Sequence, residues 1–322
     1  MAIKITDVLE ADEIREFTRA SNLHGTFAVL ATWSVIIGSF VFVAWWTHPV
    51  SILLALIVLG GRHLGLAILM HEASHRSLFA HRGLNDFIGR WLCAAPSWGD
   101  VHRYRTHHLT HHAHTGTERD NDLGLVRPFP TTRRSLVRKF VRDLLGLTGV
   151  KRIIGLLMID FGYIHYTASV DAKPIDQTGR TVGHVLKTGA RNLYPMVITN
   201  GSMLAALWVA GHPWIFGLWV LSYLTTFSLF LRIRAIAEHA CTANVPDPFR
   251  NTRTTRAGVL ARLTVAPHGV NYHLEHHLLM TVPYFRLAKL HRVLKERGAL
   301  EGAPVADSYV DVLRQVTTPQ PA

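Results

Sequence analysis

Four long apolar runs, grouped in two pairs, dominate the hydropathy pattern of this 322-residue chain. They cover about residues 26–46, 50–70, 194–210 and 214–231. Each run approaches the roughly 20 residues that a helix needs to cross about 30 Å of hydrocarbon. Because the runs within each pair are separated by a short turn, we expect two helical hairpins. The pattern predicts an all-α integral membrane protein with four transmembrane helices.

The turns inside the two predicted hairpins, 47–49 and 211–213, contain no Lys or Arg, whereas the other connections are rich in both. Since basic residues favour the cytoplasmic side of a membrane, we expect a multi-pass protein whose two turns face outward. The remaining segments would then form a cytoplasmic helical cap: residues 1–25, 71–193 and 232–322. We interpret residues 1–322 as a single domain.

The formal net charge is +12, and most basic residues lie in the predicted cytoplasmic segments. These basic segments alternate with membrane spans and contain no recognisable nucleic-acid-binding module, so we expect no nucleic-acid partner. Anionic lipid and an acidic soluble protein suit this surface better. Two cysteines provide no disulfide framework, and no organelle-targeting signal is present, so the expected location is a bacterial inner membrane.

Histidine is the residue type that points to a chemical function, with 21 copies in the chain. Three spacings stand out: His71-x-x-x-His75, His108-x-x-His111-His112 and His273-x-x-His276-His277. On a helix, positions i, i+3 and i+4 direct their side chains to one side, which is how helices present metal ligands. All three spacings lie in predicted cytoplasmic segments, so the predicted topology allows them to meet at one metal-binding place.

The three spacings resemble the histidine boxes of the membrane fatty acid desaturase and hydroxylase superfamily, and the resemblance spans nearly the whole chain. The sequences that continue from the second box to Asp120-Asn121-Asp122, and from the third box to Pro283, are similar to the desaturase versions. Membership implies a di-metal site of two iron ions held by the eight box histidines, with O₂ as co-substrate. It also implies a ninth ligand before the last box, for which His239 is the candidate.

One position departs from the pattern of the superfamily. The stearoyl-CoA branch has an Asn four residues before the ninth histidine, whereas this chain has Ala235. Glu238 or a water could fill the coordination position that this leaves open, or Glu238 could instead pair with Arg234. We expect no catalytic side chain beyond the metal ligands.

Each ligand imidazole gives one nitrogen to the metal and needs an acceptor for its other ring N–H. The carboxylates nearest in sequence are the candidate acceptors: Glu72, Glu238, Glu275, Asp120 and Asp122. Glu72 and Glu275 could equally serve as simple charge balance. His107 and His114 border the second box and are expected to support ligands or to face solvent, and nothing in the sequence singles out His291.

The resemblance implies an enzyme that desaturates the acyl chain of a lipid with O₂ and two electrons. A hydroxylase of a lipid, sphingoid, alkane or carotenoid would share the same ligands, and the sequence does not separate the two reactions. A histidine-rich metal transporter is a distant alternative, since it would carry ligands and carboxylates in mid-span. No haem, iron–sulfur or dinucleotide motif is present, so we expect a separate ferredoxin-like or cytochrome-type electron donor.

Overall fold

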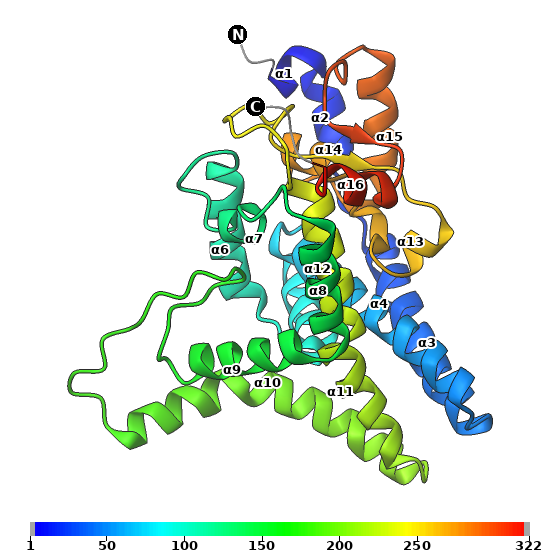
Figure 1. The fold of residues 1–322 in the computed structure, drawn as a ribbon, viewed down its shortest axis with the longest axis vertical. Coiled ribbons are helices and arrows are strands. Elements are labelled where there is room, and N and C mark those ends of the chain that lie inside the picture. The colour runs from blue at the N-terminus through cyan, green and yellow to red at the C-terminus, as the bar shows by residue number, and fades with distance from the viewer. Residues whose placement is uncertain (1–3, 319–322) are drawn as a thin grey trace.

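The computed structural model describes residues 4–318, and it is mostly helical (Figure 1). Residues 1–3 and 319–322, the outermost ends of the predicted cytoplasmic segments, lie outside the described part. Long helices extend from one end of the molecule, and shorter helices gather at the other. The strands in the described part are β1 (Thr254–Thr255) and β2 (Val305–Ala306), which pair in parallel.

The first predicted hairpin is formed by α3 (Asn22–Trp45) and α4 (Pro49–Ser74). Pro49 occupies the first position of α4, where its missing N–H would have no helical partner anyway, and the ring of His48 accepts a hydrogen bond from the amide of Val50. Both helices are long and apolar enough to cross a membrane. Because α4 continues beyond the predicted end of its span at residue 70, His71 lies in its last turn and His75 is the residue at its C-cap.

The second predicted hairpin consists of α10 (Val182–Val209), the short η3 (Pro213–Ile215), α11 (Phe216–Leu224) and α12 (Thr226–His239). The backbone bends at Thr225, so α11 and α12 are separate helices within one apolar stretch. This stretch, Pro213–His239, is also long and apolar enough to cross a membrane.

The predicted span at 194–210 lies inside α10, which is not among the three span candidates of the described residues. Polar residues lower the hydropathy of this helix, and Asn200 is an example. Its side-chain amide donates to the carbonyl of Ala95, and its oxygen accepts a hydrogen bond from Trp219 Nε1. These bonds connect α10 to its neighbours, so part of the polarity of the helix is used inside the protein.

The two hairpins meet where α4 packs against α12. A side chain at Gly60 would bring its Cβ within 2.2 Å of Thr226 Oγ1, so only glycine allows this close approach. The hydroxyl of Thr226 in turn donates to the carbonyl of Leu56 on α4. This contact places the last residues of α4 and α12 next to each other.

The remaining helices form the cap and its connections. In chain order they are α1 (Ile5–Val8), α2 (Ala11–Phe17), α5 (Arg82–Ile88), η1 (Gly89–Ala94), η2 (Ala95–Ser97), α6 (Val101–His114), α7 (Leu123–Val126), α8 (Arg133–Leu144), α9 (Leu147–Asp160), α13 (Val259–Leu263), η4 (Pro267–Gly269), α14 (His273–Leu278), α15 (Tyr284–Glu296) and α16 (Tyr309–Gln315). The N-terminal helices cover α15, because Leu9 and Phe17 share a buried apolar cluster with Leu290.

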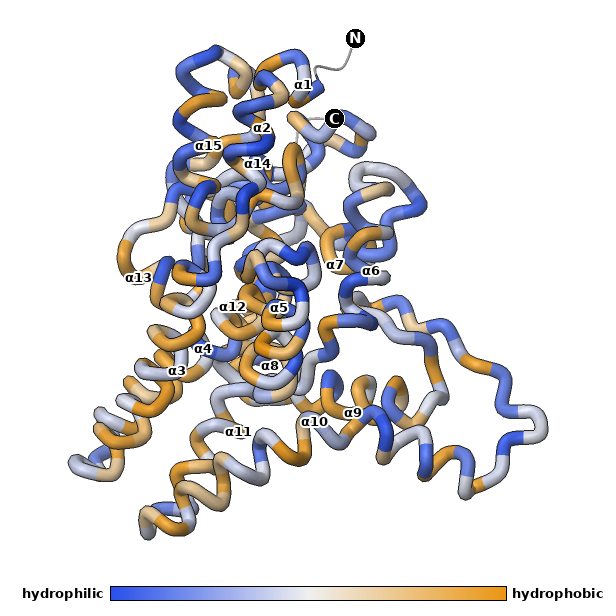
Figure 2. Tube along the Cα trace, turned by 180° about the vertical axis from the view of Figure 1, so that it is seen from behind, coloured by the Kyte–Doolittle hydropathy of each residue, from blue (hydrophilic) through white to orange (hydrophobic). Residues whose placement is uncertain are grey.

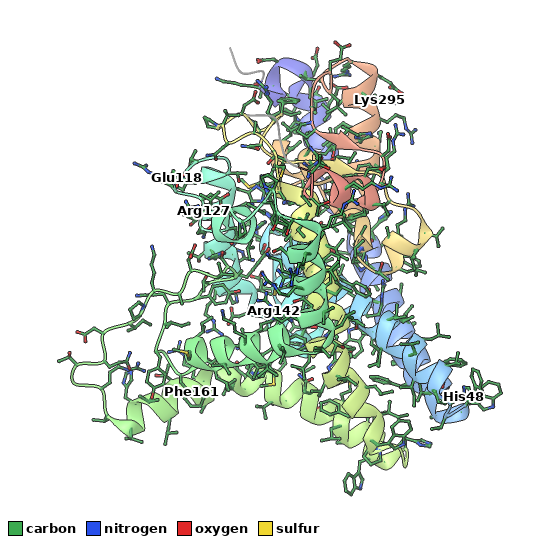
Figure 3. All side chains as sticks on the ribbon, viewed as in Figure 1. His48, Glu118, Arg127, Arg142, Phe161 and Lys295 are labelled. Carbon is green, nitrogen blue, oxygen red and sulfur yellow. The ribbon has the colours of Figure 1, made fainter. Side chains whose placement is uncertain are left out.

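The two ends of the molecule differ in polarity. Figure 2 shows hydrophobic residues concentrated along α3, α4 and α11, and more hydrophilic residues around α2 and α15. Figure 3 places His48 at the tip of the first hairpin and Lys295 of α15 at the opposite end of the molecule. The structure therefore combines an apolar end of long helices with a more polar cap.

Candidate metal centre

All nine predicted histidine ligands lie at the junction between the hairpins and the cap. They come from four helices: His71 and His75 from the end of α4, His108, His111 and His112 from α6, His239 from the end of α12, and His273, His276 and His277 from α14. The local sequence explains where α6 begins, because the Asp100 side chain caps this helix by accepting a hydrogen bond from the backbone amide of Arg103. Four helices thus bring the boxes together.

The nine imidazoles divide into two groups, each with ligand atoms within 4.8 Å of one another. One group contains His71, His75, His108, His112 and His276, and the other contains His111, His239, His273 and His277. The second and third boxes therefore each contribute to both groups. The sequence spacing alone does not predict this division.

Distances inside the groups match those between ligands of one metal. His112 Nε2 lies 3.0 Å from both His108 Nε2 and His276 Nε2, and His273 Nε2 lies 2.8 Å from His239 Nε2. Two nitrogens that each lie about 2.1 Å from one ion, at a right angle, are about 3.0 Å apart. The ring positions therefore fit a metal ion in each group.

Several ring nitrogens in the groups are buried and lack a hydrogen-bond partner among the described residues. They include the Nε2 atoms of His71, His75 and His277, together with the Nδ1 atoms of His71, His273 and His276. A buried polar atom without a partner costs roughly 1–3 kcal/mol, so such atoms are rare unless they have another role. Ligation of a metal is the role that fits the partnerless Nε2 atoms, which occur in both groups.

Burial keeps most of these imidazoles in the neutral form that binds metals. It lowers the pKa of His75 to about 3 and that of His112 to about 2. The pKa values of His276 and His277 also fall well below the ordinary range, first through burial and then through neighbouring imidazoles. At neutral pH a nitrogen lone pair is therefore available on each.

His111 differs because a carboxylate stands behind it. Its Nδ1 lies 2.7 Å from Asp120 Oδ1, which leaves Nε2 to face the other histidines of its group. Burial alone would lower the pKa of His111, but the hydrogen bond to Asp120 and the nearby Asp122 carboxylate outweigh it, so the pKa is raised. A carboxylate behind a metal-binding imidazole fixes the ring and increases its basicity.

Glu238 pairs with Arg234, one of the alternatives that the sequence leaves open. Arg234 Nε lies 2.6 Å from Glu238 Oε1, and the same oxygen lies 3.5 Å from His273 Nδ1. The carboxylate is therefore behind the ring of His273, on the side away from His239. Among the described residues, neither metal-binding group includes Glu238.

The other three predicted acceptors, Glu72, Asp122 and Glu275, form their hydrogen bonds mainly with residues other than the predicted metal ligands. Glu72 accepts hydrogen bonds from the amide of Tyr284 and the hydroxyl of Ser77, and its second oxygen lies 3.7 Å from His71 Nδ1. This carboxylate therefore ties the first box to the start of α15.

Asp122 accepts a hydrogen bond from His107 Nε2 at 2.9 Å, so His107 supports the loop behind the second box. Glu275 bonds Thr254 and His291, and His291 Nδ1 lies 2.6 Å from Glu275 Oε1. The role of His291 was missed by sequence reasoning, because only the packing of α15 against α14 reveals it.

The sequence matches the fatty acid desaturase family over residues 44–309, which covers most of the chain. The chain belongs to the fatty acid desaturase family. It is therefore related to membrane-bound oxidoreductases, and its histidine groups could hold metal.

Relatives of this desaturase-family chain catalyse different reactions. It is 24% identical to dihydrorhizobitoxine desaturase of Bradyrhizobium elkanii over 85% of this chain and 76% of that protein. It is 28% identical to β-carotene ketolase of a Paracoccus species (strain PC1) over 83% and 91%. It is 23% identical to sn-1 oleoyl-lipid 12-desaturase of Anabaena variabilis over 83% and 73%. The family is thus shown, while the substrate and the bond that reacts are not fixed.

Proposed function

We propose that this protein is a di-iron, O₂-dependent desaturase of lipid acyl chains. The single observation that carries the proposal is the convergence of nine histidines in two adjacent groups at the end of the membrane-spanning helices. Imidazole suits iron, adds no negative charge and leaves coordination positions for dioxygen. The gathering of all nine at one end of the hairpins also argues against a metal transporter, which needs ligands along a path through the membrane.

We assign one iron to the group that contains His71 and the other to the group that contains His111. Two irons bound there would supply the oxidising power that removes hydrogen from an unactivated methylene. The protein's own contribution is to hold most of the imidazoles neutral, to fix His111 through Asp120, to place the Glu238 carboxylate behind His273, and to exclude water by burial.

In desaturation, two hydrogens leave adjacent carbons, O₂ is reduced to two waters, and two further electrons and two protons are consumed. These electrons require a separate donor, for which we propose a ferredoxin-like or cytochrome-type protein. The basic cap would suit an acidic donor. We further propose a multi-pass arrangement in a bacterial inner membrane, with the metal centre on the cytoplasmic side.

A second candidate is oxygen insertion into a lipid or carotenoid. It is favoured by the β-carotene ketolase of the Paracoccus species, 91% of whose length this chain matches. The same histidines would serve either reaction. The difference depends on how long the second C–H bond stays aligned with the oxidant after the first hydrogen is removed.

Product analysis tests the proposal. The chain and its His276→Ala variant would be expressed in a host membrane with an added carotenoid, and the extracted lipids compared by mass spectrometry. A lipid species about 2 Da lighter that disappears in the variant is expected for desaturation, whereas one about 16 Da heavier would move the assignment to hydroxylation.

A matched control comes from the same helix as the second box. His102 is an exposed residue of α6 outside both histidine groups, so His102→Ala should keep full activity. Iron content of the purified proteins supplies the second measurement. A wild-type protein that folds but binds no iron would overturn the oxygenase assignment.

A further inference from the structure

A large apolar groove lies between the two hairpins, and none of the nine histidines of the metal centre lines it. It has a volume of about 890 Å³, and α3 and α10 form its long walls. Trp91 and Leu92 of η1 close one end, and His212 lies at the other. The lining residues belong to the apolar end of the molecule, where the long helices extend (Figure 1).

The shape of the groove follows from small side chains on one face of α10. Ser202, Ala206 and Ala210 are spaced four residues apart, so they lie on one side of the helix and all three line the groove. Ala44 lines the opposite wall on α3. Larger residues at these positions would fill the space.

The length of the groove matches one layer of lipid chains. Trp33 and Trp45 mark its extent along α3, and twelve residues at about 1.5 Å each span about 18 Å. One leaflet contributes about half of the roughly 30 Å hydrocarbon thickness of a bilayer. A single acyl chain inserted from the hairpin turns would therefore fit the groove end to end.

The polarity of the groove suits a lipid tail. The Trp33 Nε1–H donates to the carbonyl of Leu92, and the Thr199 hydroxyl donates to the carbonyl of Pro195, so both polar groups have partners within the protein. The walls are otherwise mostly apolar, and His212 and the exposed Trp45 lie near the turn. Trp at that position is typical of the lipid headgroup level.

The groove is separate from the metal centre. At its inner end Trp33 packs against a buried apolar cluster that includes Leu69, Ala73 and Cys93. Packed side chains therefore lie beyond this end of the groove. On these grounds we propose that the groove is a binding site for an acyl chain of a membrane glycerolipid, whose tail lies between the hairpins and whose headgroup sits beside the turns.

Native mass spectrometry of the intact protein in mild detergent tests this proposal. The wild type should retain a glycerolipid, and Ala206→Phe should lower the retained fraction by about tenfold, since an overfilled site costs about 1–3 kcal/mol. Ala205→Phe provides a matched control, because Ala205 is also exposed on α10 but does not line the groove. It should retain lipid as the wild type does.

Ala44→Phe repeats the test from the opposite wall and covers the case in which Ala206→Phe fails to fold. Iron content of each variant, which should stay at the wild-type level, shows that the metal centre is intact. Equal lipid retention in all variants would overturn the proposal. A protein dimer that Ala206→Phe dissociates, with no lipid retained by the wild type, would instead show that a second copy of the chain fills the groove.

Discussion

His111 Nδ1 and Asp120 Oδ1 lie 2.7 Å apart, and this contact joins the second histidine box to the loop that follows α6. Asp120 also accepts a hydrogen bond from the amide of Asp122, so the carboxylate is held from two directions. The ring of His111 is thereby fixed with Nε2 toward its histidine group. A residue outside the three boxes thus determines which nitrogen one box histidine presents.

Replacing Asp120 should weaken metal binding. Asp120→Ala removes the acceptor that orients His111, and the loss of such a partner costs about 10- to 100-fold in metal affinity or activity. Iron titration of the purified variant measures the effect. Glu118→Ala, in the same loop but exposed and paired with Arg127, is the control and should bind iron normally. Wild-type affinity in Asp120→Ala would contradict the orienting role.

Glu238 should matter for both stability and metal binding, because it pairs with Arg234 and stands behind His273. Glu238→Ala would leave a mostly buried cation without its partner, at a cost of about 3–5 kcal/mol. The double variant Arg234→Met/Glu238→Gln should recover most of the thermal stability, but its iron affinity should remain low. If the double variant also recovered iron affinity, Glu238 would have no role behind His273.

The Glu275–His291 pair should affect stability alone. Glu275 is fully buried and bonds His291 and Thr254 rather than a histidine of either metal-binding group. His291→Ala should lower the free energy of unfolding by about 1–3 kcal/mol, since it leaves a buried carboxylate oxygen without its donor. Thermal unfolding measures this loss. Iron bound per folded chain should stay at the wild-type level, and a loss of iron would link Glu275 to the metal centre.

The metal-free protein should lose stability in mild acid. Burial lowers the pKa of His75 to about 3 and that of His112 to about 2, whereas histidines of the unfolded chain bind protons with the ordinary pKa of 6.5. Below that value the unfolded state holds more protons, so each such imidazole costs about 1.4 kcal/mol per pH unit.

Thermal unfolding in nanodiscs at successive pH values from about 7 to about 5 measures this effect. The unfolding temperature should fall steadily with pH. In His112→Asn, which removes one of the buried imidazoles, the slope should be smaller. An unfolding temperature that does not change over this range would show that these imidazoles bind protons as readily in the folded state as in the unfolded chain.

The box histidines could be predicted from sequence because their spacing is local: one helix places His108 and His112 on the same side whatever packs against it. Pairing of Glu238 with Arg234 was foreseeable for the same reason, since the two residues are four apart on a helix. His291 was not foreseeable, because its partner belongs to a different helix. The division of the boxes between the two groups could not be predicted either, because it depends on how α6 and α14 are oriented relative to each other and not on a local sequence pattern.

Hydropathy predicted four spans, and α3, α4, and α11 with α12 are long and apolar enough to cross a membrane, whereas α10 is not among these candidates in the described part of the chain. Asn200 lowers the hydropathy of α10 while bonding groups of neighbouring segments, so a residue that looks unsuited to a membrane is satisfied inside the protein. Sequence averages do not distinguish such a residue from one that faces lipid.

The interleaving of the boxes constrains how the protein can be assembled during synthesis. The group that contains His71 also requires His276, and the other group requires three residues that follow α11. Neither group is complete until α14 has left the ribosome. The residues of both hairpins precede α14 in the chain, so metal can complete the two groups only after the hairpins have been synthesised.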